Sequence, residues 1–249
     1  RVPDVDAAIR PDTILITIMH ANNEVGTIQP IPEIAALAKK NDILMHTDAA
    51  QSVGKISTDV NELGVSLLTI AGHKVYAPKG IGALYIKDGL RLAPFCHGAA
   101  QEVGRRAGTE NVLEIVGLGK ACEVALNRLD AARTHMAKLR DRLQNGLTDA
   151  FENVRINGHP EHRLPNTLSI SFYGVEANRV LEEIGLEVAA SAGAACHSDT
   201  VEISHVLVAM GVSDDWAKGT LRFSVGRMTT KDEIDRSLDI VVKAVRRLK

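Results

Sequence analysis

Apolar residues in the first half of the chain recur in short runs that alternate with helical patterns. The runs predict four strands, at residues 14–19, 43–45, 67–70 and 81–86. Between the first two strands, Pro32 suits the first turn of a helix, and Ile34, Leu37 and Ala38 fall on one face of it. Strands that alternate with helices in this way indicate a largely parallel sheet covered by helices.

The second half of the chain has a different pattern. Residues 112 to about 147 are helical with breaks, and "NTLSISF" then alternates like a half-buried strand. The segment "LEVAASAGAACHSD" reads as a short strand that runs into a loop of small residues, and the last helix opens with a capping box from Thr230 to Glu233. We therefore expect an α/β fold in residues 1–128 and a smaller α+β domain in residues 129–249.

Composition narrows the class of protein. The chain has 249 residues, of which 45% are hydrophobic and 24% charged, with a formal net charge of -2. This is ordinary globular composition, and the low aromatic content of 3% with no basic excess argues against a nucleic-acid partner. No apolar run is long enough to span a bilayer and no signal peptide is visible, so we expect no membrane partner.

Three cysteines, Cys96, Cys122 and Cys196, are an odd number in no metal-binding spacing. They argue against a disulfide framework or a structural zinc site and favour a reducing, cytoplasmic setting. We expect Cys96 and Cys122 to be small buried hydrophobic residues. The chain has no initiator methionine and enters an apolar strand within about a dozen residues, so we expect Arg1 to lie within a domain.

One lysine, Lys74, stands in the segment "LLTIAGHKVYAPKGIGALYI" between two predicted strands. A lone lysine often lies with its stem along apolar surface and its ammonium in water. However, Lys74 is in a turn at a strand end, where ligands of α/β sheets bind. An amine partly removed from water there has a lowered pKa and can form a Schiff base with a carbonyl. His73 beside it can stack, donate a hydrogen bond or shuttle a proton.

Asp48 follows another predicted strand, in "HTDAAQ". Most aspartates at such positions cap turns. An acid and an amine at the ends of strands in one sheet would nevertheless face a common crevice. That arrangement suits pyridoxal phosphate, whose aldehyde forms the Schiff base while a carboxylate keeps the ring nitrogen protonated. Asn22, Asn23 and Gln51 also leave strand ends, and can bond the ring oxygen or the substrate or be routine turn residues.

Two residues of the second half are candidates for substrate chemistry. Cys196 lies in "SAGAACHSD", where small neighbours cannot bury it and His197 makes the surroundings polar, so it is a plausible nucleophile. Arg222 alternates with Leu221 and Phe223 and therefore points away from their face of a strand. Arginine there is commonly solvated or ion-paired, but its planar fork is also the usual clamp for a carboxylate.

Six motifs, "MHANNEVGTIQP", "HTDAAQSVGK", "AGHKVYAPKGIGALYI", "RRAGTENV", "SAGAACHSD" and "LRFSVGRMTT", resemble in order and spacing the cysteine desulfurases of the class V aminotransferase group. The resemblance extends over essentially the whole chain. It implies the aminotransferase-type fold (fold type I), with residues 1–128 as the C-terminal part of the large cofactor-binding domain and residues 129–249 as the small domain that carries the cysteine loop. It also implies an enzyme that takes sulfur from L-cysteine as an enzyme persulfide, leaves alanine and supplies iron–sulfur cluster assembly.

The resemblance also implies roles for the residues that bind the cofactor. Lys74 looks like the Schiff-base lysine and a catalytic residue, and Asp48 looks like the partner of the pyridine nitrogen. Gln51 would contact the ring oxygen, and Asn23 the cofactor and the substrate. His73 is similar to the histidine of the phosphate loop and is a further catalytic candidate.

The remaining roles concern the substrate and partners. By the same resemblance, Thr109 would reach the phosphate of the neighbouring subunit, which implies a homodimer. Arg222 would hold the substrate carboxylate, and Cys196 would take the sulfur and pass it to an acceptor or an iron–sulfur scaffold protein. Ala71 and Ala77 depart from the residues usual in the family. Ala71 lacks the hydroxyl that many relatives place next to the phosphate, which would weaken phosphate binding by roughly 0.5–1.5 kcal/mol.

Two alternatives remain open. "GAACHSD" and "LRFSVGR" are particularly similar to selenocysteine lyases, so selenocysteine is an alternative substrate. In relatives, about half of the large domain precedes the position of Arg1, including a phosphate loop and a histidine that stacks on the cofactor. An inactive fragment or interaction module is therefore the alternative of another class.

Overall fold

The computed structural model describes residues 1–197 and 200–249, and within this part it describes no side chains at residues 194–197, 200 and 201. The backbone forms two compact units. The first contains Arg1–Ala21 and Gln29–Leu129, and the second contains Asn22–Ile28 and Asp130–Lys249. The assignment of residues 1–128 and 129–249 to a cofactor domain and a cysteine-loop domain stays a prediction, but the short segment Asn22–Ile28 packs with the second unit, which the sequence does not indicate.

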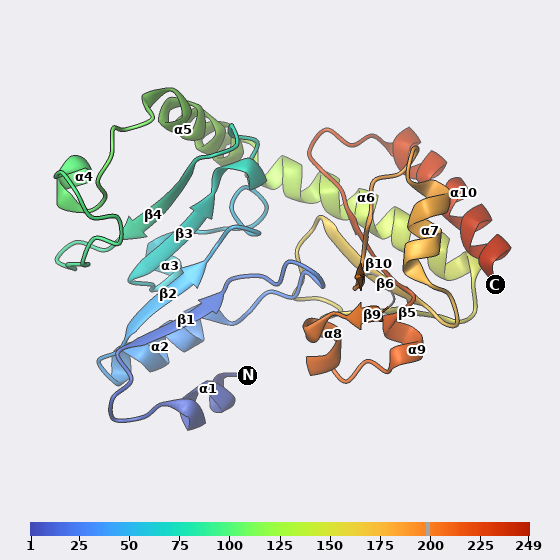
Figure 1. Ribbon diagram of the computed structural model, residues 1–249, viewed down its shortest axis with the longest axis horizontal. Helices are drawn as coiled ribbons and strands as arrows, with labels where there is room; N and C mark the ends of the chain where they lie inside the picture. Colours follow the sequence, from blue (N-terminus) through green and yellow to red (C-terminus); the bar gives the residue numbers. More distant parts are fainter. Residues whose placement is uncertain (198–199) are drawn as a thin grey trace. The chain divides into compact units, whose positions relative to one another are not determined.

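The first unit is built on a four-stranded sheet in the order β1-β2-β3-β4 (Figure 1). Its strands are β1 (Leu15–Met19), β2 (Leu44–Asp48), β3 (Leu67–Ala71) and β4 (Gly82–Ile86). Its helices are α1 (Val2–Ala8), α2 (Ile31–Lys40), α3 (Val60–Leu63), the 3-10 turn η1 (Gly72–Lys74), α4 (Gln101–Gly104) and α5 (Val112–Asn127). β1, β2 and β3 run parallel and β4 runs antiparallel to β3, so the prediction of a largely parallel sheet is confirmed.

The two faces of this sheet differ. On one face, Ile16, Met45 and Leu68 pack with buried residues of α2 and α3 in one apolar cluster. On the other face a polar chain crosses three strands, because His46 lies 2.6 Å from Thr17 through Nδ1 and 2.8 Å from Thr69 through Nε2. Burial lowers the pKa of His46, and the nearby Asp48 carboxylate opposes this shift.

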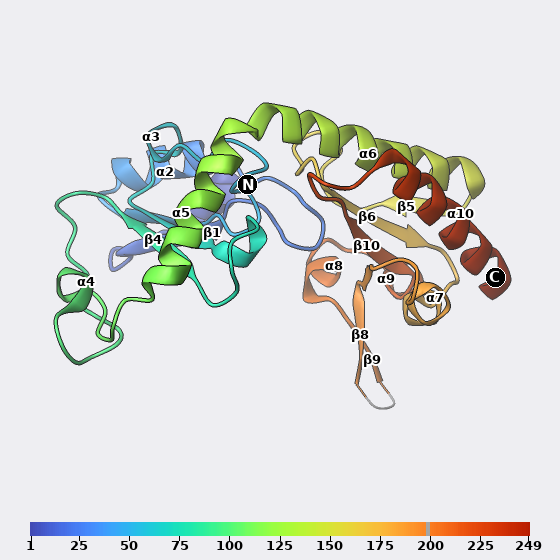
Figure 2. The ribbon, with the colours of Figure 1, turned by 90° about the horizontal axis from the view of Figure 1, so that it is seen from above.

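The second unit contains a four-stranded sheet in the order β5-β6-β10-β7 and a separate two-stranded arm, β8–β9. The strands of the sheet are β5 (Val154–Ile156), β6 (Thr167–Phe172), β7 (Ser191–Ala192) and β10 (Thr220–Ser224). The arm consists of β8 (Ala194–His197) and β9 (Thr200–Ile203). The helices are α6 (Leu129–Ala150), α7 (Ala177–Ile184), α8 (His205–Ala209), α9 (Asp214–Ala217) and α10 (Lys231–Leu248). Figure 2 shows the arm extending away from the sheet of its own unit.

The centre of the second unit is β6, which is buried at every position. Its apolar residues Leu168, Ile170 and Phe172 lie in a large cluster with residues of α6, α7 and α10. The expectation of a half-buried strand is wrong, because the serine face is buried as well. Ser171 accepts a hydrogen bond of 2.8 Å from Asn157 Nδ2 and lies 2.7 Å from the hydroxyl of Thr220. These hydrogen bonds offset the cost of burying hydroxyl groups.

The last helix confirms the prediction from its capping box. Thr230 Oγ1 accepts the Glu233 amide at 3.2 Å, and the Glu233 carboxylate accepts the Thr230 amide at 2.7 Å. Helix α10 then buries Ile234, Val241 and Val245 against the core of the second unit. In the part of the chain that the structure describes, no helix is long and apolar enough to cross a membrane.

Candidate functional site

The predicted acid and amine of the first unit leave adjacent parallel strands at the same edge of the sheet. Asp48 is the last residue of β2 and pairs in register with Thr69 of β3. Lys74 ends η1, the turn that directly follows β3. The carboxyl edge of a parallel sheet is the usual place for ligand binding in this class of fold.

The carboxylate of Asp48 is half-buried and held by the backbone. Its Oδ1 accepts the amide of Ala50 at 2.8 Å. The backbone carbonyl of Asp48 accepts a hydrogen bond from the amide of His20 at 2.8 Å. The imidazole of His20 is buried with Nδ1 2.9 Å from the hydroxyl of Ser52, and burial lowers the pKa of His20, which favours its neutral form. His20, held by Ser52, therefore fixes the backbone at the end of β2 through its hydrogen bond to the Asp48 carbonyl. The sequence alone does not reveal this role.

The turn that carries Lys74 is fixed on both sides. The Gly72 carbonyl accepts the amide of Val75 at 3.0 Å, and the Gly72 amide donates to the Ile81 carbonyl at 3.0 Å. A side chain at Gly72 would place its Cβ 2.6 Å from the Ile81 carbonyl oxygen, so only glycine fits there. The side chains of His73 and Lys74 are exposed at this fixed position, so the described residues do not remove the Lys74 amine from water, contrary to the expectation from the sequence.

Tyr76 lies two residues beyond the lysine with a φ of 68°, in the left-handed region. A bulky side chain in this region is a genuine outlier, and such strain gathers at functional sites. The strained residue is two positions from the predicted Schiff-base lysine, which is consistent with a functional turn.

A second lysine, Lys55, was not among the predicted site residues. It is partly buried, and its pKa is lowered to about 8, first by burial and then by the charge of the Lys74 ammonium. Gly54 before it adopts a φ of 74°, and a Cβ there would lie 3.1 Å from the Val75 side chain, so this turn packs beside the lysine turn. The sequence signal was the lysine that ends the quoted motif "HTDAAQSVGK".

Two further predicted residues lie on loops of the first unit. Gln51 is half-buried in the turn that follows Asp48, and Thr109 is exposed in the loop that leads into α5. Asn111 caps α5 by accepting the amide of Glu114. The predicted contacts of Gln51 and Thr109 with a cofactor stay predictions.

In the second unit the structure brings Arg222 and Asn23 together. Arg222 Nη1 donates to the Asn23 carbonyl at 2.9 Å, and Nη2 donates to the Ser191 hydroxyl at 2.9 Å. Its Nε is buried and has no hydrogen-bond partner in the described part of the chain. As the alternation predicts, Leu221 and Phe223 are buried in the core and Arg222 points to the other face.

A pocket of about 520 Å³ lies beside Arg222 and is contained in the second unit. Its polar lining includes Asn23, Glu24, Glu202, Ser204, His205 and Arg222. A guanidinium at the wall of a polar pocket is the arrangement expected for an anionic substrate group. Glu24 and Ser204, which are hydrogen-bonded to each other, were not predicted from the sequence.

The backbone of Cys196 lies in β8, opposite Val201 of β9, so a paired strand replaces the loop that was expected. Its side chain lies outside the described residues, and its role as nucleophile stays a prediction. Cys96 corrects an expectation, because it is exposed rather than buried, in the long loop between β4 and α4. Cys122 packs at the edge of the α5 cluster, and burial raises the pKa of its thiol.

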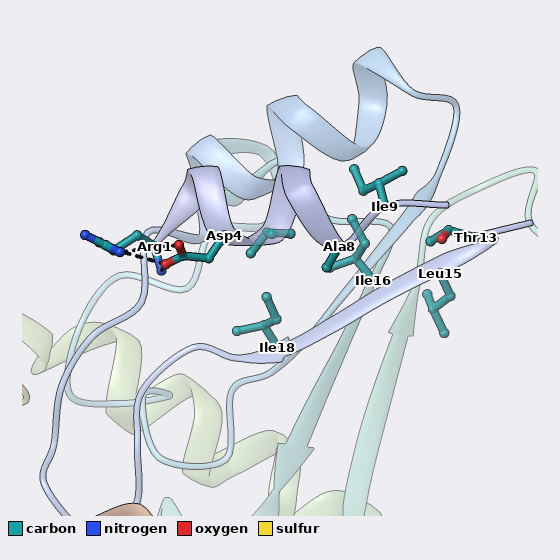
Figure 3. A pocket seen from close by; sticks show the side chains of 9 residues that line it. Arg1, Asp4, Ala8, Ile9, Thr13, Leu15, Ile16 and Ile18 are labelled. Carbon is teal, nitrogen blue, oxygen red and sulfur yellow. Dashed lines mark hydrogen bonds and ion pairs between the residues drawn. The ribbon is translucent and has the colours of Figure 1, made fainter. Parts of the chain in front are cut away.

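A second pocket, of about 380 Å³, lies between α1 and β1 (Figure 3). Ile9, Ile16 and Ile18 line it, and the Arg1 side chain donates to Asp4 at its rim. It contains none of the predicted site residues. Among the described residues, no group of three or more histidine, cysteine, aspartate or glutamate side chains is arranged to hold a metal ion.

Comparisons with known proteins agree with the motifs. The aminotransferase class-V family matches residues 1–237. The cysteine desulfurase IscS of Dictyoglomus turgidum is 46% identical over 247 residues, which are 99% of this chain and 63% of that protein. The cysteine desulfurase IscS of Methanosarcina thermophila is 48% identical over 243 residues, which are 97% of this chain and 60% of that protein. The chain thus spans about three fifths of the length of these curated relatives.

Solved structures show the same likeness. A NifS-like protein superimposes with a TM-score of 0.91 and 36% identity, covering 100% of this chain and 65% of that one. A NifS-like protein from Rickettsia africae gives a TM-score of 0.88 and 31% identity, covering 98% of this chain and 65% of that one. These matches confirm the expected aminotransferase-type fold and the resemblance to cysteine desulfurases.

Proposed function

Because the chain belongs to the aminotransferase class-V family, we propose that it acts in a pyridoxal-phosphate-dependent cysteine desulfurase, which takes sulfur from L-cysteine and leaves L-alanine. One observation carries the proposal: Asp48 and the turn of Lys74 leave adjacent parallel strands at one edge of the sheet. The relatives named above are cysteine desulfurases, which supports cysteine rather than selenocysteine as the substrate.

The residues at this edge fit the cofactor. Asp48 offers a half-buried carboxylate with one oxygen already fixed by a backbone amide, and Lys74 offers an exposed amine on a rigid turn. Asp48 would keep the ring nitrogen protonated, Lys74 would hold the aldehyde carbon, and Gln51 and His73 would contact the ring oxygen and the phosphate. When bound, pyridoxal phosphate supplies an electron sink for the substrate.

Arg222 would bind the substrate carboxylate. Each of its terminal nitrogens carries two N–H groups, and each donates one of them, to Asn23 and to Ser191. The second N–H of each nitrogen would donate to one oxygen of a carboxylate, because arginine favours such paired hydrogen bonds. Asn23 lines the same pocket and would contact the substrate beside this pair.

Cys196 would accept the sulfur. In the net reaction, L-cysteine and the thiol of Cys196 give L-alanine and a persulfide on Cys196. The carbon–sulfur bond of the substrate is replaced by a carbon–hydrogen bond, and Lys74 would deliver protons to the substrate carbons. The persulfide would then pass its outer sulfur to an acceptor, such as an iron–sulfur scaffold protein.

The homodimer belongs to this proposal. Apolar side chains near the start of α5 are exposed, since Val112, Leu113 and Val116 have exposed fractions of 64%, 83% and 66%. Such a patch favours contact with another protein surface, and a second copy of this chain is the occupant that would bring Thr109 to a neighbouring site. In sedimentation experiments we expect a dimer, and Leu113→Asp should shift it towards monomer. A monomeric wild type would contradict the homodimer.

We also propose a reducing cytoplasmic location. Cys96 is an exposed free thiol, which a reducing compartment preserves. A persulfide carrier has the same requirement, because its thiol must return to the reduced form after each turnover.

The test is to supply L-cysteine to the cofactor-loaded protein in the presence of a reductant and to measure alanine and sulfide. Equal amounts of both are expected, with faster turnover of L-cysteine than of L-selenocysteine. Faster release from selenocysteine would favour the lyase alternative. A protein that binds no pyridoxal phosphate would instead support the interaction-module alternative.

A further inference from the structure

The β8–β9 arm, residues 194–197 and 200–203, is joined to the body of its unit at Gly193 and Ser204. The Ser204 amide donates to the Gly193 carbonyl at 3.0 Å and closes the base of the arm. The Gly193 amide donates to the Thr220 carbonyl at 2.8 Å. A Cβ on Gly193 would lie 2.8 Å from Thr220 Cβ and 2.9 Å from Leu207 Cδ1, so glycine is required at this close approach. The base of the arm is therefore tied to β10 by hydrogen bonds and close packing.

The hydroxyl of Ser204 has two functions at once. It accepts the amide of Val206 at 3.1 Å and so caps α8, and it donates to the carboxylate of Glu24. The hydrogen bond to Glu24 joins residues 180 positions apart in the sequence. It links the base of the arm to the segment Asn22–Ile28, which packs with the second unit.

Glu24 is presented by a rigid turn. The Asn22 side chain accepts the amides of Glu24 at 2.8 Å and of Val25 at 3.0 Å, and the Asn22 amide donates to Thr27. Val25 is buried in an apolar cluster that includes Leu207 of α8. A carboxylate on a turn anchored in this way can restrain the group that it binds, because the turn itself cannot follow a movement of the arm.

The residue before Glu24 holds the predicted substrate clamp. The Asn23 carbonyl accepts a hydrogen bond from Arg222, and the Glu24 carboxylate accepts one from Ser204. Two adjacent residues therefore restrain the guanidinium for the substrate carboxylate and the base of the arm that carries Cys196.

We propose that Glu24 is a positioning residue for the sulfur-accepting cysteine, acting through the hydroxyl of Ser204 on the base of the β8–β9 arm. The inference rests on the proposed desulfurase function. Cys196 is only three residues beyond Gly193, so the direction in which the arm leaves the body sets the region that the thiol reaches. Release of the base would spread the arm over more directions and lower the fraction of molecules with the thiol near the substrate sulfur.

The experiment compares variants that remove the Glu24–Ser204 hydrogen bond with variants that keep it. Glu24→Ala and Ser204→Ala remove it, whereas Glu24→Gln keeps an acceptor and Ser204→Thr keeps the hydroxyl. In the cofactor-loaded protein we expect the alanine variants to lower kcat for L-cysteine by at least about tenfold, with KM within about twofold of wild type. Glu24→Gln and Ser204→Thr should stay close to wild type. Glu182→Ala, at an exposed acid of α7, is the matched control and should change neither constant.

A second readout does not depend on the reaction. Hydrogen exchange of the backbone amides of β8 and β9 should become faster in Glu24→Ala and stay unchanged in Glu182→Ala. Unchanged exchange and unchanged kcat in Glu24→Ala would overturn the inference. A higher KM with unchanged kcat would also overturn it, because Glu24 would then act on substrate binding at Arg222 instead of on the arm. If wild type formed no alanine, the proposed function would fail, while the exchange measurement would still show whether Glu24 restrains the arm.

Discussion

The sheets of the two units differ in how far their own unit covers them. In the second unit, β6 is buried at every position, and both its apolar and its serine faces are filled. In the first unit, one face packs on α2 and α3, while the other keeps Leu15 and Leu84 exposed by 41% and 47%. That second face also carries the polar chain through His46.

The difference suggests that the first unit is the place of the proposed chemistry and that the second unit has the more stable core. Sheets with parallel strands are normally covered on both faces, so the open face of the first unit leaves room for a ligand or a further layer of protein. Asp48 and Lys74 lie at the carboxyl edge of this sheet. The second unit has the more complete core, and hydrogen bonds hold Arg222, the proposed substrate clamp, and the base of the arm in this unit.

The largest expected effect is that of a substitution at Lys74, which tests whether the proposed chemistry takes place in the first unit. Lys74→Ala removes the amine that would hold the cofactor. We expect loss of the visible absorption of bound pyridoxal phosphate and a fall in desulfurase activity of roughly a thousandfold or more. Absorption spectra and alanine formation measure both effects.

Lys79→Ala is the matched control, because this lysine is exposed on the same loop five positions further along the chain. It should keep the absorption and the activity of wild type. A Lys74→Ala protein that retained the cofactor band would show that another group holds the aldehyde.

A smaller effect tests the second unit as the place of stability. Ile170 of β6 is fully buried, and Ile170→Ala should cost about 2–5 kcal/mol in the free energy of unfolding of this unit. Leu84→Ala, on the open face of the first unit, should cost below about 1 kcal/mol because the side chain is already half exposed. Hydrogen exchange measures the two units separately, which matters because two units need not unfold in one step. Equal costs at both positions would contradict the comparison.

The parts of the fold that local pattern determines were predictable. The apolar run 67–70 predicted β3, and the capping box predicted the start of α10, because both depend on residues close in the sequence. The position of Lys74 at a strand end followed from the same run. The resemblance then added a cofactor role that the pattern alone left open.

The rest depends on contacts between distant segments. The serine face of β6 reads as solvent-exposed until Asn157 and Thr220 are known to lie against it. The local sequence also does not reveal the hydrogen bond of Glu24, because its partner Ser204 is 180 positions away. Nor does it reveal that Cys96 is exposed. The lowered pKa of Lys55 has a similar origin, because burial and a second ammonium cause it and neither is visible in local sequence.

The smallest expected effect concerns that lysine and the stability of the first unit. The pKa of Lys55 is about 8 in the folded chain against an ordinary value of 10.5. Between these two values the unfolded chain binds more protons, so the free energy of unfolding should rise as pH increases through this window. At neutral pH the charged, partly buried amine destabilises the folded state, and Lys55→Met should stabilise the cofactor-free protein by about 1–2 kcal/mol, a figure reduced for solvent screening.

Hydrogen exchange of the first unit, followed below and above pH 8 in wild type and Lys55→Met, measures this effect. The variant should lose the part of the pH dependence that belongs to Lys55, while Lys79→Met, at an exposed lysine, should keep it. Lys74→Ala should retain a weaker dependence, because burial, the larger cause of the lowered pKa, remains when the second ammonium is removed. Identical pH profiles in wild type and Lys55→Met would contradict the lowered pKa of Lys55 and would mean that its amine is solvated in the folded chain.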